Sequence, residues 1–82
     1  MTLFTYHPHI LAELARHGLS PQATTPPEKL RDAVRDLYKY EIRVLRQELL
    51  AGRIHRRDYA GKVIELRTRY PLLSIPIQMW TV

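Results

Sequence analysis

The sequence predicts a small all-α fold in a single domain that spans residues 1–82. Apolar side chains recur at helical spacing in three stretches, and proline and glycine mark the ends of those stretches. The chain contains no cysteine, so neither a disulfide nor a thiolate metal site supports its core. A core of this size needs long, well-packed helices or a partner subunit. We expect three helices, the second and third forming a long antiparallel hairpin against which both termini pack.

A short first helix is predicted over residues 8–17. Pro8 suits an early helical position, and Gly18 suits the position just past the end. Leu19 would then make the apolar contact that often accompanies such an end. The apolar stripe of this helix comprises Ile10, Leu11 and Leu14.

The second helix is predicted over about residues 26–51. Thr25-Pro26-Pro27-Glu28 has the pattern of a capping box, in which the Thr25 hydroxyl and the Glu28 carboxylate satisfy free backbone N–H groups. Gly52 ends the helix. One broad arc, wide enough to be covered by two neighbouring helices, carries Leu30, Val34, Leu37, Tyr38, Ile42, Val44, Leu45 and Leu49.

The third helix is predicted over about residues 56–69. It ends at Tyr70-Pro71, because the residue before a proline avoids the helical region. The short link 52–55 makes the two long helices antiparallel neighbours. A narrow apolar stripe is formed by Tyr59, Val63, Leu66 and Tyr70.

The tail, residues 72–82, is apolar and carries no charged side chain. Its β-branched content favours an extended segment, whereas Ser74 with Pro76 behind it favours a short capped helix. In either form we expect the tail to pack across the helices, because an exposed apolar tail would promote aggregation.

The run LRQELLAGRIHRRDY, residues 45–59, resembles the C-terminal helical hairpin of the SHOCT family. In that family one helix ends at Gly-x-Ile and an aromatic residue begins the next helix. The resemblance implies a role in oligomerisation or partner contact. The family's usual threonine and acidic residues are replaced here by His55, Arg56 and Arg57, so its function is not transferred to this chain.

Two carboxylates, Glu41 and Glu48, fall within the apolar arc of the second helix. Burying a carboxylate costs several kcal/mol unless it is paired, so we expect both to be buried in structural pairs. Candidate partners for Glu41 are Arg16, Arg67 and Tyr59. The alternative is a catalytic or metal-binding carboxylate pair, but no Glu-x-x-His spacing and no matching acidic residue on another helix accompany it. We therefore expect no enzyme activity.

The positive charge is concentrated between residues 39 and 69, where nine cations and four anions account for the whole net charge of +5. Earlier cations of the second helix have acidic neighbours, and Asp58–Lys62 and Glu65–Arg69 are favourable i, i+4 pairs on the third helix. Around the turn between these helices the compensation fades. We call the arginines there the basic bend, and they are candidates for binding phosphate or nucleic acid: Arg43, Arg46, Arg53, Arg56 and Arg57.

Other side chains predict no ligand or cofactor. His7, His9 and His17 lack the accompanying ligands of a metal site. Tyr40 lies opposite the apolar arc, where either the N-terminal segment or a partner would cover it.

No apolar run approaches a membrane span, and the N-terminus lacks the pattern of a signal peptide, so a cytoplasmic protein is expected. The sequence predicts a non-enzymatic protein-interaction module that uses the hairpin and the apolar tail. Its partner is another protein or a second copy in a two-fold dimer. The alternative is an accessory nucleic-acid-binding protein that uses the basic bend at residues 43–57, and neither prediction includes a small-molecule substrate.

Overall fold

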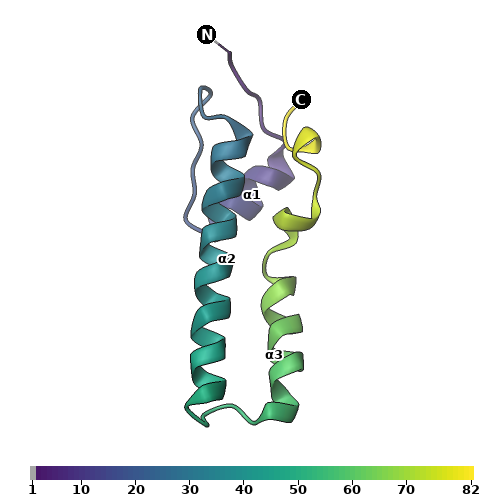
Figure 1. The fold of residues 1–82 in the computed structure, drawn as a ribbon. Coiled ribbons are helices and arrows are strands. Elements are labelled where there is room, and N and C mark those ends of the chain that lie inside the picture. Colours follow the sequence, from purple (N-terminus) through teal and green to yellow (C-terminus); the bar gives the residue numbers. More distant parts are fainter. Residues whose placement is uncertain (1) are drawn as a thin grey trace.

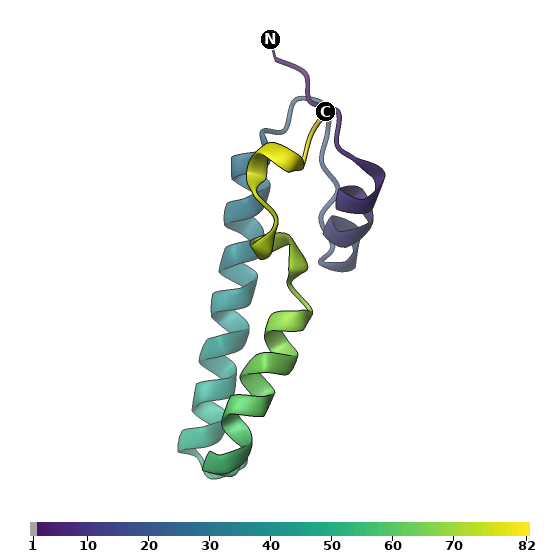
Figure 2. The ribbon, with the colours of Figure 1, turned by 90° about the vertical axis from the view of Figure 1, so that its right-hand side faces the viewer.

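A computed structural model describes residues 2–82, which form three α-helices and no β-strand. The all-α prediction is confirmed, and each helix starts and ends within one residue of the expected bounds. Helices α2 and α3 form the antiparallel hairpin, and α1 lies beside the half of the hairpin that is farther from the bend (Figures 1 and 2). The elements are α1 (Pro8–Arg16), α2 (Pro27–Leu50), α3 (Arg56–Thr68) and the 3-10 helices η1 (Pro71–Ser74) and η2 (Ile77–Met79).

Glycine ends both α1 and α2, as predicted. Gly18 has a φ of 75° and Gly52 a φ of 78°, which is the left-handed region that glycine adopts without a Cβ penalty. Past α2, the Gly52 N–H donates to the Leu49 carbonyl and the Arg53 N–H to the Glu48 carbonyl. This pair of bonds satisfies carbonyls that the helix end would leave free.

The capping box predicted at Thr25 is wrong. Pro26 occupies the N-cap position, and no side chain caps the helix. The Thr25 hydroxyl instead accepts a hydrogen bond from the Gln22 N–H at 3.0 Å. The physical reason is that Pro27 begins the helix, because its fixed φ suits the first helical position, and this places Thr25 outside the helix.

The hydrophobic core lies at the end of the molecule away from the bend. Trp80 is fully buried there, and its indole N–H donates to the Ile75 carbonyl at 3.1 Å. The core draws on the three α-helices, η1 and both termini: Tyr6, Ile10, Leu14, Leu30, Val34, Leu66, Tyr70, Leu72 and Trp80.

The tail packs on the helices, as predicted, but it is neither a continuous extended segment nor a helix capped by Ser74. Ser74 is the last residue of η1, and η2 follows. After η2 the chain becomes extended and Thr81 forms an isolated antiparallel bridge with Tyr6. The two ends of the chain therefore hold each other at one end of the molecule (Figure 1).

The molecule is elongated, with principal extents of 50 × 17 × 17 Å. Below α1 the hairpin stands alone as two helices (Figure 2). Within residues 2–82, no helix combines the length and the apolar character that crossing a membrane requires.

Candidate functional site: the hairpin arm and its groove

We call residues 35–65 the arm, because this stretch of the hairpin lies beyond the core. No side chain of the arm is buried, although it lies directly between the buried residues Val34 and Leu66. Its inward apolar residues, such as Leu45 and Val63, are only half-buried. The two helices of the arm thus cover each other on one side and leave other sides open.

Three hollows that share lining residues follow one another along the arm, and we call them together the groove. The groove begins beside Arg16 and His17 at the end of α1, and it ends near the bend beside Arg53 and Arg57. Its middle section is a hollow of ≈ 410 Å³ between α2 and α3. The groove therefore continues, towards the bend, the face of the hairpin that α1 covers farther up.

Three apolar side chains of α2 lie along the flank of this groove about one helical turn apart. Leu37 is 38 % exposed, Tyr40 62 % and Val44 37 %. The sequence predicts that either the N-terminal segment or a partner covers Tyr40. Because Tyr40 is exposed, the N-terminal segment does not cover it. Contact of Tyr40 with a partner stays a prediction.

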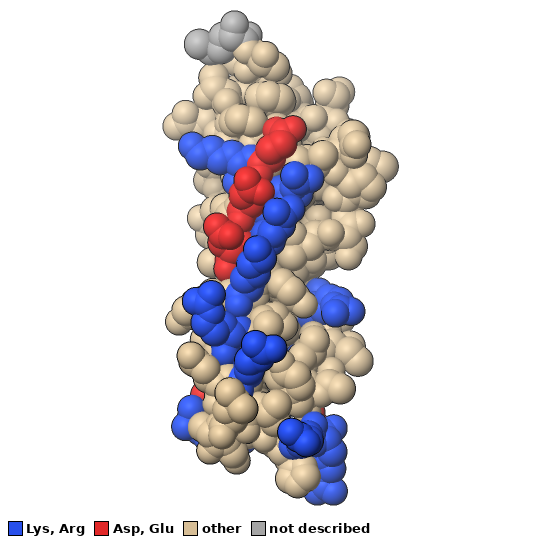
Figure 3. Space-filling model, viewed as in Figure 1, with Lys and Arg blue, Asp and Glu red and all other residues tan. Residues whose placement is uncertain are grey.

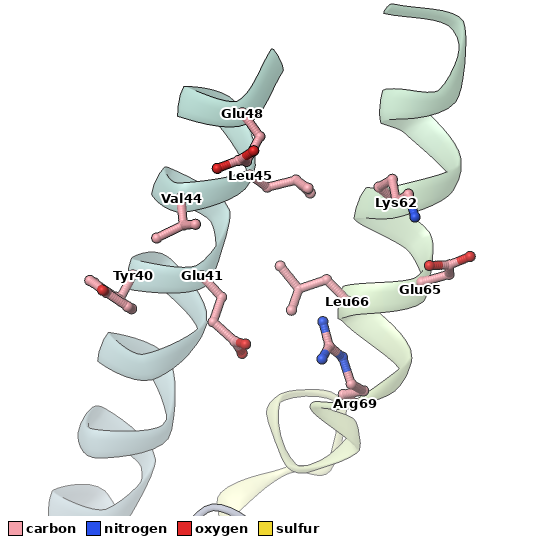
Figure 4. A pocket seen from close by; sticks show the side chains of 9 residues that line it. All are labelled: Tyr40, Glu41, Val44, Leu45, Glu48, Lys62, Glu65, Leu66 and Arg69. Carbon is pink, nitrogen blue, oxygen red and sulfur yellow. The ribbon is translucent and has the colours of Figure 1, made fainter. Parts of the chain in front are cut away.

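Charged side chains of both signs line the middle of the groove. Figure 4 shows Glu41 of α2 and Arg69 at the end of α3 both directed into the gap between the helices. Lys62 and Glu65 of α3 line the same section. The salt bridges recorded among residues 2–82 do not include the expected pairs Asp58–Lys62 and Glu65–Arg69.

Glu41 is half-buried, not buried, and its partner is Tyr70. The Tyr70 hydroxyl donates a hydrogen bond to the Glu41 carboxylate. None of the partners predicted from the sequence holds it, because Tyr70 leaves the helical path before Pro71 and turns its ring into the core. Burial, and then the bond to Glu41, raise the pKa of Tyr70 to about 12.

The Tyr70 ring also joins α1 to the hairpin. It stacks on the His17 ring with 4.5 Å between ring centroids, and it meets the Tyr38 ring edge-on at 5.3 Å. The sequence placed Tyr70 on an inward stripe but gave no sign of these partners. The stacking fixes the C-terminal end of α1 at the upper end of the groove.

Glu48 is also half-buried, and its partner is local. The Arg53 guanidinium donates to the Glu48 carboxylate across the end of α2, with 2.5 Å between Nε and Oε2. This hydrogen bond lowers the pKa of Glu48 and raises that of Arg53. The prediction that Glu48 is buried is wrong. The turn at Gly52 brings Arg53 to the Glu48 carboxylate at the surface, where both side chains still contact solvent.

The five arginines of the basic bend have different surroundings in the structure. All five arginines are exposed, but Arg53 is neutralised by Glu48. Arg57 lines the groove near the bend, whereas Arg43, Arg46 and Arg56 do not line it. Figure 3 shows the face of the hairpin opposite α1: red and blue atoms run side by side in the upper part, and blue predominates in the lower part.

The histidines do not assemble a ligand set. His7 and His9 stack on each other with 5.6 Å between ring centroids, far from the arm, while His17 stacks on Tyr70. Across the part of the chain that the structure describes, no group of three or more His, Asp or Glu side chains is placed to hold a metal ion.

Comparison of the chain with protein-family models, with curated proteins and with solved structures finds no match. The resemblance to the SHOCT hairpin therefore rests on residues 45–59 alone. Any function has to be inferred from the groove and from the charges around it.

Proposed function

We propose that the protein is a non-enzymatic interaction module that binds a protein surface through the grooved face of its arm. The observation that carries the proposal is the absence of any buried side chain between Val34 and Leu66. Helices in proteins are stabilised mainly by packing of an apolar face, so a two-helix arm with an open apolar flank gains stability when another helix covers it.

The lining of the groove favours a protein as the partner. Tyr40 and Val44 provide an apolar strip, and Glu41, Lys62 and Glu65 place charges of both signs beside it. An apolar centre with a polar rim is the usual anatomy of a protein interface. A polyanion would instead meet carboxylates along the whole middle of the groove.

The experiment is affinity capture from a native lysate with three tagged forms of the chain: wild type, Val44→Asp and Ile64→Asp. Val44 is 37 % exposed on the groove flank, whereas Ile64 is 61 % exposed and does not line the groove. We expect wild type and Ile64→Asp to recover the same proteins, or an untagged copy of the chain, and Val44→Asp to lose them. Equal recovery by all three forms would contradict the proposal.

A second candidate function, accessory nucleic-acid binding, is favoured by the cations outside the groove. Arg43, Arg46 and Arg56 are exposed, and none takes part in the salt bridges recorded for residues 2–82. The affinity for random duplex DNA should then fall steeply as the salt concentration rises. It should also fall when Arg43, Arg46 and Arg56 are all replaced by alanine. The matched control is Arg35→Ala, because Arg35 is paired with Asp32. The absence of binding at low salt removes this candidate.

A further inference from the structure

We propose that the occupant of the groove is a second copy of this chain. In this dimer two arms pack groove to groove, antiparallel, about a two-fold axis that crosses the arm at Val44. The inference rests on the proposed function and names its partner. Four observations carry it: the free length of the groove, the surface area, and the register of α2 and of α3.

The part of the groove that α1 leaves free has room for the arm of a second copy in the antiparallel arrangement. Between Leu37, level with the end of α1, and its last residue, Leu50, α2 runs about 20 Å at 1.5 Å per residue. In the antiparallel arrangement the bend of one copy reaches the end of α1 in the other. In a parallel arrangement the two α1 helices, which lie on this same face, would occupy the same space (Figure 2).

The surface area of the single chain exceeds what a compact monomer exposes. The chain exposes 6048 Å² for its 9.7 kDa, whereas compact monomers of that mass expose roughly 5,100 Å². The excess is about 900 Å², close to the roughly 800 Å² that each partner contributes to a standard interface. Its radius of gyration is 15.3 Å, against about 12 Å for a compact domain of this length.

On α2, the two-fold axis gives exposed side chains partners on the second copy. Val44 lies over Val44 of the second copy. Tyr40 and Glu48 stand four residues to either side of the axis, so each Tyr40 lies opposite Glu48 of the second copy. Tyr40, which is 62 % exposed in one chain, thereby gains an acceptor for its hydroxyl together with cover for its ring.

On α3, the same axis pairs opposite charges. Figure 4 shows Leu45 level with Lys62 and Glu41 level with Leu66, so the axis at Val44 crosses α3 between Lys62 and Glu65. Lys62 then lies opposite Glu65 of the second copy. Farther from the axis, Arg69 and Asp58 face each other by the same symmetry.

The glycine of α3 fits this packing. Gly61 lines the groove, and a Cβ built on it would meet nothing within 4 Å. A helix-interior glycine costs about 1 kcal/mol relative to alanine, and the open space at Gly61 leaves room for the second copy to approach the backbone of α3.

The first test is the mass in solution, by sedimentation equilibrium across protein concentration. We expect wild type and Ile64→Asp to reach twice the 9.7 kDa of one chain, and Val44→Asp to weaken the dimer more than 100-fold by placing two carboxylates at the axis. Circular dichroism checks that the variants stay helical. A wild-type chain that stays monomeric overturns the dimer, and so does a dimer lost with Ile64→Asp but kept with Val44→Asp.

A charge exchange tests the register. Lys62→Glu places two like-charged pairs across the interface and should weaken the dimer about tenfold. Adding Glu65→Lys to the same chain restores opposite charges at both pairs and should restore the affinity. A double variant as weak as the single one overturns this register.

A distance measurement tests the direction of packing. The chain has no cysteine, so Lys29→Cys carries a single nitroxide label at an exposed site near the start of α2. Antiparallel packing about Val44 separates the two labels by about 45 Å, and parallel packing leaves them within about 30 Å. The shorter distance overturns the antiparallel dimer.

The failure of this inference differs from the failure of the proposed function. A monomeric chain that still captures another protein through Val44 overturns only the dimer. A monomeric chain that captures nothing overturns both.

Discussion

Tyr70 donates a hydrogen bond from its hydroxyl to the carboxylate of Glu41, and so ties the segment between α3 and η1 to the middle of α2. The tyrosine is 4 % exposed and the glutamate is half-buried. This contact sits where the packed core gives way to the arm. It therefore marks the limit of the buried core along the hairpin.

Tyr70→Phe should lower the free energy of unfolding by roughly 1–2 kcal/mol, because the Glu41 carboxylate loses a donor while it stays half-buried. Urea denaturation measures the change. Tyr38→Phe is the matched control, since Tyr38 touches the same ring but none of the recorded side-chain hydrogen bonds involves its hydroxyl. Equal losses in the two variants would contradict a role for the hydroxyl.

The same contact predicts a loss of stability in alkali. The pKa of Tyr70 is raised from its ordinary value of 10.0 to about 12, first by burial and then by the bond to Glu41. The fold therefore favours the neutral phenol. The resulting stability is complete below pH 10 and is lost as pH rises from about 10 to about 12. Urea midpoints across this window should fall less steeply for Tyr70→Phe, and identical slopes would refute the assignment.

The helices were predictable because their ends are marked locally. Gly18 and Gly52 each stop a helix within a turn of the last apolar position, and Pro71 does so for α3. The start of α2 was missed by one residue because two consecutive prolines compete for its first turn. Pro27 begins the helix, and Thr25 bonds to the preceding turn instead.

The groove was only half predictable. Helical periodicity gave α2 an apolar arc too wide for one neighbour, which anticipated an uncovered flank. The periodicity did not predict which part of the apolar arc would stay exposed, because this depends on where α1 and the tail pack. They cover Leu30 and Val34 and leave Leu37 and Val44 exposed. The partner of Glu41 was missed because Tyr70 lies beyond the end of α3, where helical spacing no longer fixes direction.

Two glycine substitutions should have opposite effects, measured in the Val44→Asp background so that self-association does not contribute. Gly52→Ala forces a Cβ into a backbone with φ of 78° and should destabilise the fold by about 1–2 kcal/mol. Gly61→Ala adds a methyl group in open space within a helix and should stabilise it by about 1 kcal/mol. Thermal unfolding compares them, and a gain from Gly52→Ala would contradict the helix-ending role of Gly52.

One side chain of the tail, Trp80, should be essential for the stability of the fold. Trp80 is fully buried among residues of α1, α2 and η1, and the His7 N–H donates to its carbonyl at 3.1 Å. Trp80→Ala should cost about 3–5 kcal/mol, which is most of the stability of a small domain, and leave the chain largely unfolded by circular dichroism. Met79→Ala is the control, because that neighbouring side chain is 61 % exposed and should change stability little. If Trp80→Ala unfolds with the same urea midpoint as Met79→Ala, the tail does not belong to the core.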